Sequence, residues 1–258
     1  MSPAIWWATR SYMIPSYDLE KIKFATDAST FERAVGLYEA GKVTEFQNEG
    51  VGFSAVVIGT KPYRVFVSAR HYDRGSCDCY LGQEDTLCKH MVALAIQVVT
   101  RGNPLSSEDK KLIDQPACSG RLGTLEKEEL VEAKKSITSA MRHIKAYVGP
   151  SRTWFAYQDS LSEGCRRLSA LVSDLPVSAQ TAKLLVDMLL RLDNKLCRGG
   201  VDDSDGTVGG FIGETVQVLE EYASLDSACA RAFHSLMNRE TCFGWEEPLV
   251  RILDEAEG

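Results

Sequence analysis

The chain has 258 residues, of which 44% are hydrophobic, enough for one large domain or two ordinary domains with real cores. It contains no apolar run long enough for a membrane-spanning helix, and residues 1–7 lack the pattern of a signal peptide. The net charge of −7 argues against a uniformly basic nucleic-acid-binding protein. We therefore expect a cytoplasmic protein whose eight cysteines stay as thiols or bind metal.

The charge is unevenly distributed along the chain. Residues 1–105 contain 11 basic and 11 acidic side chains, whereas residues 106–258 contain 18 basic and 25 acidic ones. A protein that binds duplex DNA on its own usually carries a basic surface. The neutral first part and the acidic second part weigh against strong autonomous DNA binding, although a local basic patch is compatible with both.

The first part of the chain mixes helical and strand-like periodicity. A capping-box pattern at residues 29–32 predicts a short helix over residues 31–40. Two runs rich in β-branched side chains, residues 51–59 and 63–70, predict two or three antiparallel strands. A sheet this small needs a packed helix or a metal to be stable by itself.

Four side chains of metal-binding type follow closely: Cys77, Cys79, Cys88 and His90. Three thiolates and one imidazole are a common ligand set of closed tetrahedral zinc sites. Residues two apart on an extended strand face the same side, and the last pair precedes an apolar run, residues 91–99, that predicts a buried helix. Because a closed site leaves no position for water or substrate, we predict one structural zinc ion.

Other histidines and cysteines have less specific interpretations. His71 is either a substitute for one of these ligands or a group that hydrogen-bonds to one of them, or, as we favour, a polar residue at a strand end. Core packing best explains the remaining cysteines, which are Cys118, Cys165, Cys197, Cys229 and Cys242. A second metal site made of Cys229, His234 and Cys242 is a weaker alternative.

The second part of the chain is helical throughout. Apolar stripes at three- and four-residue steps cover residues 130–148 and 154–175, and Ser178 caps a third helix whose stripe ends at Leu196. Further helices are expected near residues 210–223, 226–238 and 246–255. We predict an α+β protein, in which a small zinc-stapled antiparallel sheet with helices (residues 1–105) precedes a linker with a short helix (106–119) and an all-helical bundle domain (120–258).

Asp202, Asp203 and Asp205 lie in a glycine-rich segment, residues 199–210. The EF-hand pattern fails there, because apolar residues would occupy positions that need carboxylates. We interpret the segment as a loop whose polar side chains cap the next helix. A recognition loop for a partner or a cation is the alternative.

The pattern Cys-x-Cys, eight residues, Cys-x-His resembles the SWIM zinc finger, and the expected upstream helix and strands extend the resemblance over about residues 28–100. The resemblance implies that Cys77, Cys79, Cys88 and His90 are the zinc ligands and that the module has no catalytic residues. SWIM modules accompany bacterial ATPases and occur in transposases and recombination accessory proteins. They are generally regarded as DNA-binding or protein-binding modules.

These patterns together predict binding rather than catalysis. The sequence has no phosphate-binding loop, nucleophile elbow or His-Glu-x-x-His motif, so we expect neither an enzyme nor a small-molecule substrate. We favour an adaptor for a protein partner, such as an ATPase. The alternative is a DNA-binding accessory protein that uses side chains around the zinc module, namely Lys61, Arg64, Arg70, Arg74, Lys89, Tyr63, Tyr72 and Tyr80.

Overall fold

The computed structural model describes residues 13–257, so residues 1–7, which we judged not to be a signal peptide, lie outside the described residues. The chain divides between Leu112 and Ile113 into an N-terminal unit and a C-terminal unit. The division falls inside the segment predicted as a linker. Within residues 13–257, no helix is both long enough and apolar enough to cross a membrane.

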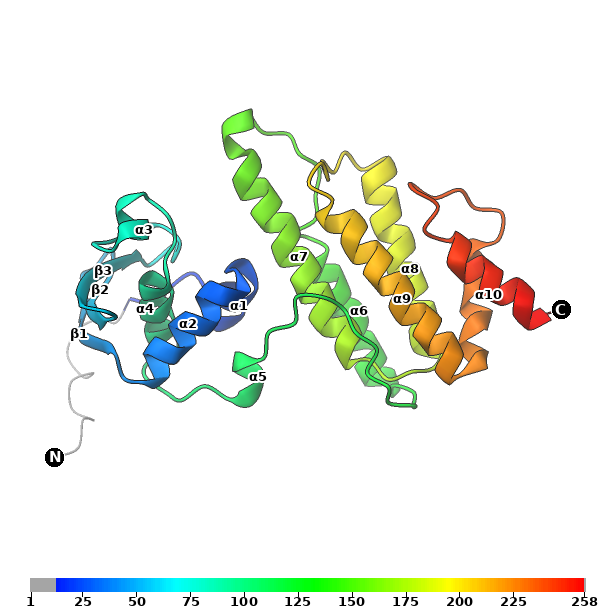
Figure 1. Ribbon diagram of the computed structural model, residues 1–258, viewed down its shortest axis with the longest axis horizontal. Coiled ribbons are helices and arrows are strands. Elements are labelled where there is room, and N and C mark those ends of the chain that lie inside the picture. Colours follow the sequence, from blue (N-terminus) through cyan, green and yellow to red (C-terminus); the bar gives the residue numbers. More distant parts are fainter. Residues whose placement is uncertain (1–12, 258) are drawn as a thin grey trace. The chain divides into compact units, whose positions relative to one another are not determined.

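The N-terminal unit is an α+β structure built on an antiparallel sheet of strand order β1-β2-β3-β4 (Figure 1). Its elements are α1 (Leu19–Ala25), α2 (Ala28–Glu39), β1 (Val43–Asn48), β2 (Gly52–Ile58), β3 (Pro62–Ser68), β4 (Gly75–Cys77), α3 (Tyr80–Gln83), α4 (Lys89–Thr100) and α5 (Ser107–Lys110). Strands β2 and β3 pair in register from Gly52 opposite Ser68 to Ile58 opposite Pro62.

Helix α4 is the centre of this unit because it is buried on two sides. One side packs against the sheet, where Leu94 and Val98 join a cluster with Val65 and Val67 of β3. The other side packs against α1 and α2 through a second cluster that includes Phe31. Burial on both sides explains why the run after His90 is almost continuously apolar, and it confirms the predicted helix.

Two local predictions for this unit were wrong in detail. Helix α2 begins three residues earlier than the predicted range 31–40, because the carboxylate of Asp27 accepts the Thr30 N–H at 2.9 Å and caps the helix. Strand β1 was not predicted, since its sequence is mostly polar. It lies at the edge of the sheet, where it pairs only with β2, and its side chains are exposed or half-buried.

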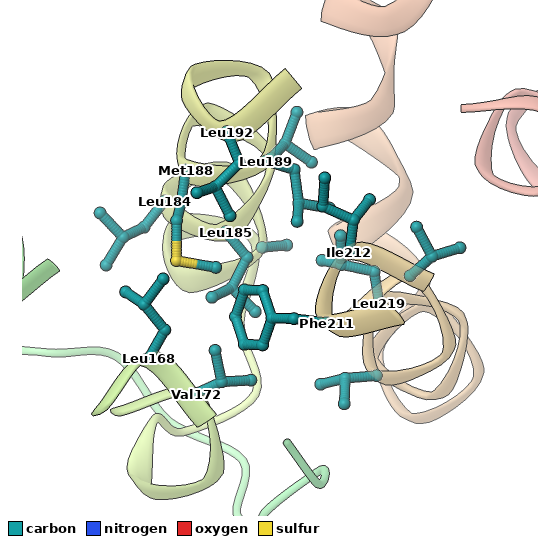
Figure 2. Close-up of a cluster of buried hydrophobic side chains, with 14 of the residues drawn as sticks. Leu168, Val172, Leu184, Leu185, Met188, Leu189, Leu192, Phe211, Ile212 and Leu219 are labelled. Atoms are coloured by element: carbon teal, nitrogen blue, oxygen red, sulfur yellow. The ribbon is translucent and has the colours of Figure 1, made fainter. Parts of the chain in front are cut away.

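The C-terminal unit is helical, as predicted. Its elements are α6 (Lys127–Ala140), the 3-10 turn η1 (Ser151–Thr153), α7 (Trp154–Asp174), α8 (Ala179–Cys197), α9 (Thr207–Leu225), the 3-10 helix η2 (Ser227–Leu236) and α10 (Glu247–Glu257). Figure 2 shows the core between α7, α8 and α9, where the Phe211 ring lies among leucine and valine side chains of the other two helices. Leu168 of α7 and Leu185, Met188, Leu189 and Leu192 of α8 belong to the apolar stripes that the sequence predicted, whereas for α9 only the helix itself was predicted.

Helix α6 ends earlier than its apolar pattern indicated. The carbonyl of Ile144 accepts Lys195 Nζ at 2.6 Å, and the carbonyl of Lys145 accepts the Tyr157 hydroxyl at 2.9 Å. After Ala140 the chain tightens into turns, in which the N–H groups of Arg142 and His143 donate to the carbonyls of Ser139 and Ala140, and the two tertiary hydrogen bonds hold the segment that follows. Val148, which we placed on the buried stripe, is 96% exposed.

The aspartate-rich segment forms the loop between α8 and α9. The Asp203 carboxylate accepts the N–H groups of Val208 and Gly209 at 2.7 and 2.8 Å, and the Asp202 carboxylate accepts Trp154 Nε1–H at 3.1 Å. Asp205 accepts the Thr207 N–H at 3.3 Å. The capping role predicted for this segment is confirmed, while its role as a recognition loop stays a prediction.

Candidate metal centre

The four predicted ligands lie together beside the sheet. The ligand atoms of Cys77, Cys79, Cys88 and His90 are all within 4.8 Å of one another, and none of the four residues is more than 7% exposed. His90 Nδ1 lies 3.7 Å from the sulfur of Cys77 and 3.9 Å from that of Cys88. Tetrahedral zinc with ordinary bond lengths requires a sulfur-to-nitrogen separation of about 3.6 Å, so the donor set fits one zinc ion.

Three elements bring these side chains together. Cys77 is the last residue of β4, Cys79 is the N-cap of α3, and Cys88 is the N-cap of α4, which places His90 in the first turn. The N-terminal end of a helix carries partial positive charge and favours a thiolate beside it. The eight residues from Tyr80 to Leu87 reverse the chain direction. As a result, the N-terminal ends of α3 and α4 both face the metal site.

A hydrogen bond between two of the thiols shifts their pKa values in opposite directions. The side-chain hydrogen bond with Cys77 lowers the pKa of the Cys88 thiol to about 4, with help from His90 and against the opposing effect of burial. The same hydrogen bond, together with burial, raises the pKa of the Cys77 thiol. The hydrogen-bonded pair therefore loses a first proton readily, as binding of a metal by a thiolate requires.

The imidazole of His90 is held by its surroundings. Its ring stacks on that of Tyr63, with centroids 4.4 Å apart. Its Nε2 is buried and has no hydrogen-bond partner, and a Cβ added at Gly59 would come within 2.7 Å of that nitrogen. Nδ1 faces the thiols, so this packing fixes which nitrogen would bind the metal.

We expect Gly59→Ala to weaken zinc binding and to destabilise the N-terminal unit by about 1–3 kcal/mol, because the new methyl group overlaps His90 and Tyr63. Gly36→Ala is the matched control. A Cβ at Gly36 meets nothing within 4 Å, and the residue lies inside α2, so alanine there should stabilise by about 0.5–1 kcal/mol. Zinc titration and thermal unfolding of the two variants test both statements. Equal zinc affinity in both would contradict the role given to Gly59.

A second glycine permits a close backbone approach at the centre. The N–H of Gly82 donates to the sulfur of Cys79 at 3.4 Å, and a Cβ on Gly82 would come within 2.3 Å of the Cys77 carbonyl oxygen. Neither glycine was singled out from the sequence, since nothing in the local pattern tells which strand or loop approaches a ligand. Only the spacing of the ligands themselves was informative.

The residues predicted to contact a nucleic acid or a partner are not all on the surface. Arg64, Arg70, Arg74 and Tyr80 are exposed and Lys89 is half-buried. Tyr72 was placed wrongly among them. It is 3% exposed, packs edge-on against Tyr17 and shares a 3.0 Å hydrogen bond with Thr26, so it belongs to the core.

The basic side chains are also spread along the sheet rather than gathered at the centre. Cys77 pairs with Val65, next to Arg64, whereas the Arg74 carbonyl accepts the Ser68 N–H at the far end of β3. Val65 and Ser68, which mark these two places on β3, are about 10 Å apart along the strand. In addition, Arg64 faces Asp78, with 3.8 Å between their charged groups.

The other histidines and cysteines that the sequence analysis singled out lie outside the metal centre. Cys165 and Cys229 are buried, as expected for core residues, and Cys118 is half-buried. His71 is exposed and does not belong to the ligand group. For Cys197 and Cys242, core packing was the wrong interpretation, because a disulfide joins them. The alternative metal site with Cys229 and His234 is therefore wrong as well.

Comparisons with protein-family models, with curated proteins and with solved structures gave no match. The geometry defines a buried Cys3His group beside a small antiparallel sheet, with the spacing Cys-x-Cys and Cys-x-His of a zinc module. Such a group can hold one metal ion, and its donor atoms suit zinc.

Proposed function

We propose that this chain is a non-enzymatic adaptor in which a SWIM-type zinc module and a helical unit mediate binding to a protein. The observation that carries the proposal is the closed metal centre. All four donor atoms come from the chain, and all four residues are buried. Zinc with four protein ligands has no position at which to activate water, so its contribution is to fix the surrounding surface.

That surface combines apolar and charged side chains. Tyr80 and Leu81 follow the ligand Cys79 directly and are 78% and 42% exposed on α3. Arg64 on β3 and Asp78, which directly follows β4, offer both signs of charge. Large aromatic and apolar side chains that a metal holds in place, with a mixed-charge rim, suit a protein partner, and an ATPase of the kind SWIM modules accompany is the partner we favour.

The same surface is less suited to DNA as the main partner. A nucleic-acid-binding surface gathers basic side chains along one face, and phosphate contacts dominate its affinity. Here Arg64 is next to an acidic side chain, while Arg70 and Arg74 lie beyond the other end of β3. The C-terminal part of the chain is acidic and would repel a phosphate backbone.

We expect the double variant Tyr80→Ala, Leu81→Ser to lose at least about tenfold in affinity for the partner protein while keeping its zinc, because exposed aromatic anchors contribute most of an interface's binding energy. The partner is captured with the full chain from nuclease-treated extract, identified, and then titrated in purified form. Val51→Ser is the matched control. Val51 is equally apolar and exposed, but it lies at the β1–β2 turn.

Two outcomes would contradict the adaptor proposal. The first is equal loss of partner binding in the control, which would show that the surface next to the metal centre is not involved. The second is tight DNA binding by the purified chain at physiological salt, falling steeply as salt rises and abolished with zinc retained when Arg70, Arg74 and Lys89 are replaced together. That result would favour the DNA-binding alternative.

A further inference from the structure

A second cluster of reactive side chains lies in the C-terminal unit. The ligand atoms of Asp193, Cys197 and Cys242 are within 4.8 Å of one another. Cys197 is the last residue of α8, and Cys242 lies in the segment 237–246 between η2 and α10. A disulfide joins the two cysteines, with their Cα atoms 5.9 Å apart. This separation is typical of disulfide-bonded residues.

Asp193 holds the segment in place independently of the sulfur atoms. Its Oδ1 accepts the N–H of Cys242 at 2.8 Å and the Nε1–H of Trp245 at 3.0 Å. The indole of Trp245 is buried in the helical core. These contacts do not involve either sulfur, so they persist when the cysteines are reduced and keep the two thiols at high effective concentration.

We propose that Cys197 and Cys242 are a reversible thiol–disulfide pair that fastens the segment 237–246 to the end of α8 and that reacts with low-molecular-weight disulfides such as glutathione disulfide. Cys197 is the accessible member, since it is exposed, whereas Cys242 is half-buried. Asp193 acts as a positioning residue. The inference does not depend on the proposed function of the zinc module.

The chemistry is two thiol–disulfide exchanges. The Cys197 sulfur, after losing its proton, attacks one sulfur of the small disulfide, forms a mixed disulfide and releases one small thiolate. The Cys242 sulfur then loses its proton and attacks Cys197 Sγ, which forms the intramolecular bond and releases the second thiolate. The chain loses two protons and two electrons, and the small disulfide takes up both electrons as two thiols.

The surroundings of Cys197 favour a persistent bond over a fast sensor. The carbonyl end of α8 and the Asp193 carboxylate, whose Oδ2 lies 3.9 Å from Cys197 Sγ, both disfavour a further negative charge there. The reduced pair therefore gains no thiolate stabilisation, which leaves the disulfide favoured at equilibrium and its formation slow. The pair would respond to the redox balance of its compartment rather than to brief oxidant pulses.

The test equilibrates the full zinc-loaded chain in buffers of defined reduced and oxidised glutathione, followed by acid quenching, alkylation and peptide mapping. We expect the peptide of Cys197 to become linked to that of Cys242, while Cys118, Cys165 and Cys229 remain alkylatable after denaturation. Asp193→Ala should shift the linked fraction to about tenfold more oxidising buffer, because it removes two hydrogen bonds to a charged acceptor. Asp193→Asn, which keeps an acceptor oxygen, should shift it less.

Three outcomes would overturn the inference. In one, both thiols stay free at every glutathione ratio. In another, Cys242 pairs with a cysteine other than Cys197. In the third, the reduced chain takes up a second zinc ion that Cys197→Ser and Cys242→Ser each remove, which would make the cluster a metal site instead. Cys118→Ser is the matched control, since a free, half-buried cysteine outside the pair should change none of these readouts.

Discussion

Replacing Cys88 with serine is expected to reduce the zinc content from one ion per chain to almost none and to unfold the N-terminal unit. Cys88 is the sulfur with the lowered pKa and the N-cap of the central helix α4. Loss of a thiolate ligand should weaken zinc binding by more than about 100-fold, the upper end of what an outer-shell partner contributes. A hundredfold weaker affinity corresponds to about 2.7 kcal/mol of zinc-linked stability.

Metal analysis and circular dichroism measure this effect, and a chelator applied to the unaltered chain should reproduce it. The helical signal of α6 to α10 should remain, since the C-terminal unit has a core of its own. Cys118→Ser is the control and should keep its zinc. A Cys88→Ser chain that binds zinc normally, or that loses zinc with no change in unfolding, would show that the metal is not structural.

The second large effect concerns the C-terminal unit. Under oxidising conditions, we expect Cys197→Ser to lower the free energy of unfolding of this unit by about 4 kcal/mol. A cross-link between residues 45 apart in sequence restricts the unfolded chain, and loop-closure entropy for that length gives this magnitude. Urea unfolding followed by circular dichroism, with variant and unaltered chain compared in the same buffer, provides the measurement.

The same comparison in excess reductant separates the cross-link from local packing. Both chains then lack the disulfide, so the difference between them should disappear. A difference of similar size that persists in reductant would mean that serine disturbs the contacts around Asp193 instead. Cys118→Ser should unfold like the unaltered chain in both buffers, because Cys118 takes part in no disulfide.

The metal centre was predictable from sequence because its information is local. Cys77, Cys79, Cys88 and His90 lie within one short stretch, and thiolate and imidazole at paired spacing have few other uses. The buried helix after His90 and the apolar stripes of α7 and α8 were predictable for a similar reason. Periodic apolar side chains fix which face of an element is buried, whatever that face packs against.

Other features were decided by contacts between residues far apart in the chain. The polar edge strand β1 exists because β2 pairs with it, and the segment after α6 is held by the side chains of Lys195 and Tyr157, which donate to the carbonyls of Ile144 and Lys145. Tyr72 looked like a surface aromatic residue until the fold placed Thr26 beside its hydroxyl. No local pattern encodes such contacts, since each depends on which elements pack together.

The sequence by itself determined the α+β and helical parts of this protein, its Cys3His group and the capping role of its aspartate loop. Tertiary structure alone decided the pairing of Cys197 with Cys242, the place of Asp193 between them and the glycine that fits against His90. The physical reason is distance along the chain. A metal motif and an amphipathic helix are encoded by residues close together in the sequence. A disulfide or a close backbone approach joins residues far apart in the sequence, so it forms only when the chain folds.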